Sequence, residues 1–171
     1  MGKINLAEGV KLKSILSKRI HELTDEMQRS AFVLVEKGRK PAQGPRTMED
    51  IERELEQVRK DSRTLDRLIY RANIDHTIEA VGEEMPIVEA IELATQLRAK
   101  AMQYKTFAQA NKEEIQYGYA EGTVIYRIAT FDPEDYRKKA EEAERRAHKL
   151  SNAINAKNYS VILDFDDSAY F

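Results

Sequence analysis

The sequence predicts a helix-dominated α+β fold: an antiparallel bundle of four long helices with short β-strands and hairpins between them. Three observations favour it. Apolar residues recur every three or four positions through four long stretches, which is the period of an amphipathic helix. Short runs rich in β-branched and aromatic residues separate those stretches. Charged residues make up 34% of the 171 residues and hydrophobic residues 42%, a composition typical of a soluble globular protein.

Composition also excludes several classes of function. The formal charge of −2 argues against general affinity for nucleic acid, and the lack of cysteine excludes disulfides and thiolate chemistry. No apolar run approaches the roughly 20 residues of a membrane-spanning helix, and the first residues lack the apolar core of a secretory signal. We therefore expect one domain over residues 1–171, with no membrane or nucleic-acid partner. We expect it in the cytoplasm, or in the host cytoplasm if a phage encodes it.

The first helix is expected over residues 5–29. Its apolar stripe has helical spacing and consists of Leu12, Leu16, Ile20, Leu23 and Met27. Such a helix is about 37 Å long at 1.5 Å per residue, so it needs other helices alongside it. Residues 30–36 follow, and their apolar run predicts a buried strand. That run is Phe32, Val33, Leu34 and Val35.

The second helix is expected over residues 47–72, beginning with a capping box of Thr47 and Asp50. Four arginines lie four positions apart on one of its faces: Arg59, Arg63, Arg67 and Arg71. Like charges at this spacing destabilise an isolated helix by roughly 0.2–0.5 kcal/mol per pair. Arg59 and Arg63 each have an acid within helical reach, but Arg67 has none. Arg67 therefore pairs with an acid of another helix or subunit, stays solvated, or binds an anion.

A polar break follows the second helix. The side chains of Asn73 and Asp75 can hydrogen-bond the local backbone and end the helix. Residues 77–85 predict a short strand and a hairpin that turns at Gly82. His76 is the only histidine beside a break between elements. A lone histidine is more often a structural residue than a ligand or a base, so both interpretations stay open.

The rest of the chain alternates in the same way. A third helix is expected over residues 86–110, with Pro86 in its first turn, and a fourth over residues 132–156. The aromatic, β-branched and glycine residues of 114–130 predict two strands and a turn, and residues 158–165 predict a last strand. The second strand of 114–130 is apolar on both faces. We therefore expect Arg127 to be partly buried and paired with a carboxylate or an anion.

Several positions resemble a family of bacterial and phage proteins known as septicolysin-like. They are Ile69, Asn73 and Thr77 at the helix end, Gly82, Ala90, Arg127 with Asp132, and the closing Ile154, Ala156, Asn158 and Tyr159. The family usually carries a tryptophan where this chain has Tyr159. The resemblance covers most of the chain, from about Leu6 to Tyr159. It implies a helical bundle with small β-elements that assembles with itself, and little chemistry.

The sequence favours a binding protein over an enzyme. It has no phosphate-cradling glycine loop and no nucleophile elbow, and its histidines His21, His76 and His148 are scattered. Asp164 and Asp166 lack a third carboxylate or a histidine nearby, so we expect no metal and no cofactor. A hydrolase of a phosphorylated small molecule remains the less favoured alternative.

We expect a non-enzymatic homo-oligomer that binds a small anionic, nucleotide-like ligand. Guanidinium groups suit phosphates and aromatic rings suit a base. Residues of these types gather at breaks between elements, and the candidate site consists of Arg67, Tyr70, Arg71, Asn73, His76, Tyr117, Tyr126 and Arg127. Small, cysteine-free, oligomeric phage proteins that sequester nucleotide immune signals fit this description by analogy. The alternative from another class is a structural or interaction protein whose arginines pair with acids of a neighbouring subunit.

Overall fold

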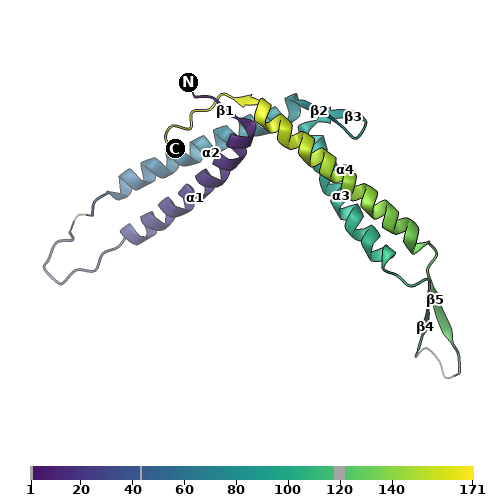
Figure 1. Ribbon diagram of the computed structural model, residues 1–171. Helices are drawn as coiled ribbons and strands as arrows, with labels where there is room; N and C mark the ends of the chain where they lie inside the picture. The colour runs from purple at the N-terminus through teal and green to yellow at the C-terminus, as the bar shows by residue number, and fades with distance from the viewer. Residues whose placement is uncertain (1, 43, 118–121) are drawn as a thin grey trace. The chain divides into compact units, whose positions relative to one another are not determined.

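The computed structural model describes residues 2–42, 44–117 and 122–171. Within these residues four α-helices dominate the chain: α1 (Leu6–Ser30), α2 (Met48–Asp75), α3 (Ile87–Ala108) and α4 (Pro133–Ser160). The strands form antiparallel pairs: β1 (Ile4–Asn5) with β6 (Ile162–Leu163), β2 (Thr77–Ala80) with β3 (Glu83–Pro86), and β4 (Glu113–Gln116) with β5 (Ile125–Ile128). The predicted helix-dominated α+β class is confirmed (Figure 1).

The chain divides into two compact units, each with its own helix pair. Unit 1 consists of Met1–His76 with Lys157–Phe171, and unit 2 of Thr77–Ala156. Unit 1 contains α1, α2 and the β1–β6 pair, while unit 2 contains α3, most of α4 and both hairpins. The single domain over residues 1–171 stays a prediction.

Unit 1 is an antiparallel helix pair with a core of large aliphatic side chains (Figure 1). Both helices begin with a capping box, Asn5 with Glu8 in α1 and the predicted Thr47 with Asp50 in α2. The buried side chains between the helices include Leu12, Leu16, Leu23, Ile51, Leu55, Val58, Leu65 and Ile69. Gly9 lets β6 approach, because a β-carbon there would lie 2.8 Å from Cδ1 of Leu163.

The closing segment confirms the predicted alternation, although its strand is shorter than expected. Val161, Leu163 and Phe165 are buried, while Ile162 and Asp164 between them are exposed. The α4 helix continues to Ser160, four residues beyond the prediction, so strand pairing is confined to Ile162–Leu163.

The buried strand predicted over residues 30–36 is wrong. Helix α1 continues to Ser30, and residues 31–36 belong to no strand. The four apolar side chains of this run are exposed by 89%, 58%, 104% and 50%, in the order Phe32, Val33, Leu34 and Val35. The run lies in the connection beyond the ends of α1 and α2, where no described element of unit 1 covers it (Figure 1). Composition alone predicted the burial, and the neighbour needed for it is absent from the described unit.

Unit 2 pairs α3 with α4 through small residues. The buried alanines are Ala90, Ala94 and Ala101 on α3 and Ala140, Ala143 and Ala147 on α4. Lys105 forms an ion pair with Glu144, and Arg98 donates to Ser151, so the two helices run antiparallel. Four rings close one end of the pair, with centroids 5.0–5.3 Å apart: Tyr104, Phe107, Phe131 and Tyr136.

The unit 2 termini and hairpins follow the sequence closely. The Asp132 side chain accepts from the backbone N–H of Glu134 at 3.0 Å, and Pro133 is the first helical residue, as predicted. Val81 and Gly82 both have positive φ, 52° and 86°, and make the two-residue turn of the β2–β3 hairpin.

Candidate ligand-binding site

The predicted site residues fall into two groups, one in each unit. Arg67, Tyr70, Arg71, Asn73 and His76 lie on or just after α2, and Tyr117, Tyr126 and Arg127 lie on or beside the β4–β5 hairpin. All are exposed except Asn73, which is half-buried. Tyr117 is the last residue described before the gap at residues 118–121. Each group is therefore a surface of its own unit.

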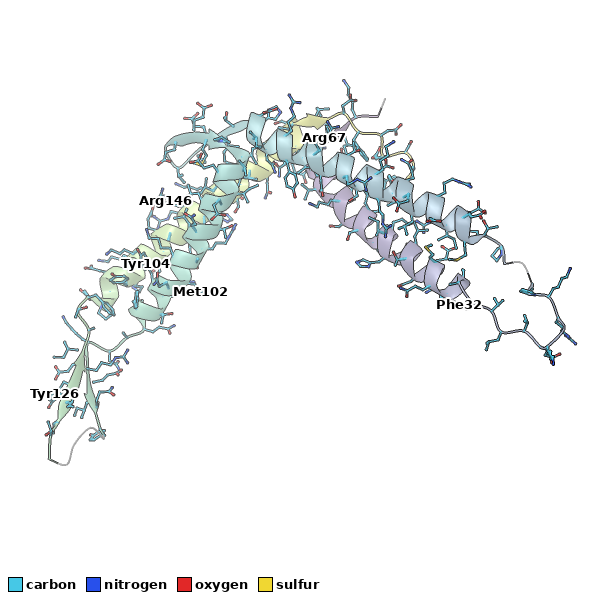
Figure 2. All side chains as sticks on the ribbon, turned by 180° about the vertical axis from the view of Figure 1, so that it is seen from behind. Phe32, Arg67, Met102, Tyr104, Tyr126 and Arg146 are labelled. Atoms are coloured by element: carbon cyan, nitrogen blue, oxygen red, sulfur yellow. The ribbon has the colours of Figure 1, made fainter. Side chains whose placement is uncertain are left out.

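The first group belongs to a basic stripe on the exposed side of α2. Helical spacing places Lys60, Arg63 and Arg67 along it, and we call these three residues the α2 basic stripe. Tyr70 and Ile74 continue it and are exposed by 59% and 61%. The stripe thus leads from cationic groups to an exposed aromatic ring and an aliphatic side chain. Figure 2 marks Arg67 on this helix.

The acids near the α2 basic stripe form ion pairs with other cations. Asp66, which the sequence places within reach of Arg63, instead binds Nζ of Lys13 on α1 at 2.7 Å. Arg71 donates from Nε to Oδ2 of Asp75 at 3.0 Å. Among the described residues, none forms an ion pair with Lys60, Arg63 or Arg67. The expectation that Arg67 lacks an acid on its own helix is confirmed, and Arg63 joins it for a reason visible only in the structure.

Lys13 and Asp66 lie beside this group of residues, and no pattern in the sequence singled out Lys13. Lys13 lies 5.4 Å from the ring centroid of Tyr70, within range of a cation–π contact. Its hydrogen bond to Asp66 raises the pKa of Lys13 above its ordinary value. The lysine therefore stays charged, and its ammonium group lies over the ring of Tyr70.

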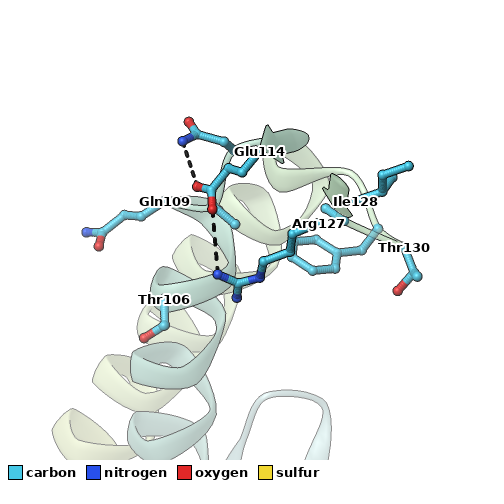
Figure 3. Close-up of a pocket in the computed structure, with 10 residues that line it drawn as sticks. Thr106, Gln109, Glu114, Arg127, Ile128 and Thr130 are labelled. Carbon is cyan, nitrogen blue, oxygen red and sulfur yellow. Dashed lines mark hydrogen bonds and ion pairs between the residues drawn. The ribbon is translucent and has the colours of Figure 1, made fainter. Parts of the chain in front are cut away.

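Of the second group, Arg127 lines a pocket of about 280 Å³ in unit 2, whereas Tyr117 and Tyr126 are not among its lining residues (Figure 3). Its walls come from the end of α3, the β4–β5 hairpin and the approach to α4: Thr106, Gln109, Ala110, Asn111, Glu114, Arg127, Ile128, Ala129, Thr130 and Phe131. Amide and hydroxyl groups from Gln109, Asn111 and Thr130 accompany one arginine and one carboxylate. The sequence did not single out these amide and hydroxyl residues, because they carry no spacing signal.

Arg127 does not have the partly buried environment expected from the sequence. Its side chain is 72% exposed, and all four residues of β5 are exposed, because the hairpin has only two strands. Its partner is the carboxylate of Glu114 opposite it on β4, with 3.7 Å between Nη1 and Oε2. Asn111 donates to the other oxygen of Glu114 at 2.8 Å. The charges of Arg127 and Glu114 therefore offset each other.

Comparison with known proteins identifies the family. The model of a family described as "Family of unknown function (DUF6847)" matches residues 13–163. The chain belongs to the DUF6847 family. A crystal structure of a functionally unknown conserved protein from Corynebacterium diphtheriae is similar to this chain, with 25% sequence identity and a TM-score of 0.64. The match covers 95% of this chain and 100% of that one.

No curated protein matches this chain. The resemblance to septicolysin-like proteins stays a prediction, because neither match carries that name. The comparisons thus place this DUF6847 protein in a family and a fold, and its function has to be argued from its surfaces.

A second charged cluster in this DUF6847 protein has a structural explanation. Arg19 and Arg46 both bind Glu54 between α1 and α2, with Nε of Arg19 donating to Oε1 at 3.1 Å. Burial pushes the pKa of Glu54 upwards, but the hydrogen bonds and charges of the two arginines outweigh it and leave the pKa lowered. Nearby, the Tyr170 hydroxyl donates to Asp61 at 2.6 Å. Burial is the main cause that raises the pKa of Tyr170, and this hydrogen bond raises it further. Both arginines of this cluster are therefore paired with described carboxylates.

The described residues offer neither a metal site nor a membrane-spanning helix. Within the described ranges, no three histidine or carboxylate side chains gather closely enough to hold a metal ion. None of the helices described is both long enough and apolar enough to span a bilayer.

Proposed function

We propose that this protein is a non-enzymatic, homo-oligomeric binding protein for a small anionic, nucleotide-like ligand. The observation that carries the proposal is the α2 basic stripe. Its residues, Lys60, Arg63 and Arg67, form no ion pair with any described acid. Neighbouring like charges repel, and a bound phosphate would remove that repulsion while accepting charge-assisted hydrogen bonds.

The aromatic residues supply the second half of the proposal. Tyr70 lies next along the stripe with an exposed ring, which a base could stack on beside a phosphate held by Arg67. Asn73 and His76 follow at the end of α2 and add an amide and an imidazole. Tyr117, Tyr126 and Arg127 form a second set on and beside the β4–β5 hairpin. Of these, Arg127 lines the unit 2 pocket, where an anion has to compete with Glu114 for it.

The proposal includes no chemical conversion. Lysine and arginine side chains stay protonated at neutral pH, so the stripe offers charge and hydrogen-bond donors rather than a general base. A protein that only binds acts by lowering the free concentration of its ligand. We propose this role in the cytoplasm, in the manner of phage proteins that sequester nucleotide immune signals.

Arg67→Ala tests the proposal, with ATP and ADP-ribose as probes in titration calorimetry. Loss of a hydrogen bond to a charged group costs about 1.5–3 kcal/mol, so the affinity should fall by roughly 10- to 150-fold. The melting temperature should stay unchanged or rise slightly, because a repulsion is removed. Arg53→Ala is the matched control, since Arg53 is another exposed arginine of α2 and pairs with Asp50.

An earlier melting transition of Arg67→Ala with unchanged affinity would refute the ligand assignment. Native mass spectrometry of the protein purified from cells complements this test, because it reports both the subunit number and any small molecule retained. A retained molecule that chromatography finds converted after release would place the protein among enzymes.

A structural or interaction protein is the second candidate function. The observation that favours it is the β4–β5 hairpin, which carries exposed apolar side chains on one of its faces. On that face lie Ile115, Val124, Tyr126 and Ile128, exposed by 47%, 61%, 50% and 63%. Large exposed apolar patches mark protein–protein contacts in soluble proteins.

A further inference from the structure

Two apolar surfaces are not covered by any other described residues. The first is the 32–35 segment in unit 1, which consists of Phe32, Val33, Leu34 and Val35, with exposures between 50% and 104%. The second is the β4–β5 surface in unit 2, which consists of Ile115, Tyr117, Val124, Ile125, Tyr126 and Ile128, with exposures between 39% and 86%. Figure 2 marks Phe32 on the first surface and Tyr126 on the second.

Part of the backbone of each surface also has no described hydrogen-bond partner. The 32–35 segment lies outside every described strand, and no backbone hydrogen bond of Val33, Leu34 or Val35 is found in the described chain. The β4–β5 sheet has only two strands, so each strand keeps one outer edge without a described neighbour. An open sheet edge presents unpaired N–H and C=O groups that bind an additional strand. The β-branched and aromatic residues of the 32–35 segment favour the strand conformation.

Charge distinguishes the two edges of the hairpin. The 32–35 segment is followed by Glu36, whose carboxylate pairs with Arg39. Beyond it on either side lie Arg29 and Lys37, and neither forms an ion pair in the described chain. Strand β4 begins with Glu113, an exposed acid that also has no described ion pair. Strand β5 carries no acid, and its one charged residue, Arg127, is paired with Glu114. A strand with basic flanks therefore fits the outer edge of β4 better than that of β5.

We propose that the 32–35 segment of one copy adds as a strand to the outer edge of β4 in a second copy of the chain. Every copy of the chain contains both the 32–35 segment and the open β4 edge. One copy can therefore supply the added strand while a second copy supplies the edge that it pairs with. Strand addition pairs the open backbone groups, places the apolar side chains of the 32–35 segment beside those of β4 and brings basic flanks to Glu113. The inference rests on the self-assembly included in the proposed function.

Because the chain has no cysteine, introduced cysteines can test this contact directly. Leu34→Cys protein is mixed with Ile115→Cys protein, the latter altered on β4, and oxidised under mild conditions. A disulfide requires α-carbons about 4.4–6.8 Å apart, a separation that facing positions of paired strands can reach. We expect a mixed covalent dimer at several times the yield from Leu34→Cys with His148→Cys, whose cysteine lies on the exposed side of α4.

A third mixture, Leu34→Cys with Tyr126→Cys, tests the choice of edge. Tyr126 faces Ile115 from the other strand of the hairpin, so its cysteine lies one strand farther from the β4 edge. We expect a lower yield than with Ile115→Cys. A higher yield at Tyr126 would overturn the choice of β4, and yields equal to the His148 control at both positions would overturn the whole inference.

Leu34→Asp supplies a second measurement. Leu34 is fully exposed in the single chain, so the change should leave folding intact while placing a charge in the contact. Analytical ultracentrifugation should show at least tenfold weaker self-association than for the unaltered protein. Met102→Asp is the control, because Met102 is 69% exposed on α3 and lies outside both surfaces.

Unchanged association of Leu34→Asp would contradict the inference. Calorimetry with ATP and ADP-ribose on the same variants separates this result from a failure of the proposed function. Ligand binding that persists while the cross-links fail overturns only the contact. Cross-links that form without ligand binding overturn only the ligand assignment.

Discussion

The two helix pairs solve the same packing problem with different side chains. Between α1 and α2 the core is built from leucine, isoleucine and valine, and ion pairs such as Arg19 with Glu54 connect the helices. Between α3 and α4 the buried residues are mostly alanines, and four aromatic rings close one end. Large aliphatic side chains bury more apolar area per residue, whereas alanines allow a close approach that tolerates little change in volume. Stability should therefore respond to loss of volume in unit 1 and to gain of volume in unit 2.

The largest expected effect is Leu16→Ala in unit 1. Leu16 is fully buried in the α1–α2 core, so its truncation removes apolar area and leaves a cavity. We expect a loss of about 2–5 kcal/mol in the free energy of unfolding, measured by urea denaturation followed by circular dichroism. Ile15→Ala is the control, because the neighbouring Ile15 is partly exposed and its truncation should cost less. Equal losses for the two variants would contradict the assigned core.

The next effect concerns the alanine seam of unit 2. Ala147 is 3% exposed on α4, and a leucine there would have to push α3 and α4 apart. Ala147→Leu should lower the free energy of unfolding by about 1–3 kcal/mol, the usual cost of overpacking. Ala99→Leu, at an exposed position of α3, should change it little. If Ala147→Leu were as stable as the unaltered protein, the two helix pairs would not differ as described.

The smallest effect is the dependence of unit 1 on pH. The pKa of Glu54 lies below its usual value of 4.5, so the stability that its ion pairs contribute is present above about pH 4.5 and is lost as the pH falls through the folded-state pKa. Glu54→Gln should lower the free energy of unfolding at pH 7 by about 1 kcal/mol, since the group is partly exposed. The variant should also lose less stability than the unaltered protein between pH 5 and about pH 3.

Thermal melts at several pH values measure this difference. Glu52→Gln is the control, because Glu52 is an exposed acid of α2 that has no described ion pair. A Glu54→Gln profile parallel to that of the unaltered protein would show that the Arg19–Glu54–Arg46 cluster contributes nothing to acid stability.

Features of this fold that depend on neighbouring residues could be predicted from the sequence. Helix period, the Thr47–Asp50 capping box, the Asp132–Pro133 helix start and the turn at Gly82 were all predicted correctly, because each depends on residues a few positions apart. The lack of an acid beside Arg67 on α2 was also readable, since helical reach is fixed by spacing.

Burial and the choice of ion-pair partners became visible only in the three-dimensional structure. The apolar run of residues 32–35 was expected to be buried, and Arg127 partly so, but burial depends on a neighbour that no local pattern specifies. Asp66 is a second example. Its position on α2 is within helical reach of Arg63, but the packing of α1 on α2 brings Lys13 to it, and the two form an ion pair. Long-range contacts choose among partners that are equally available along the chain, and this choice leaves the α2 basic stripe without acids.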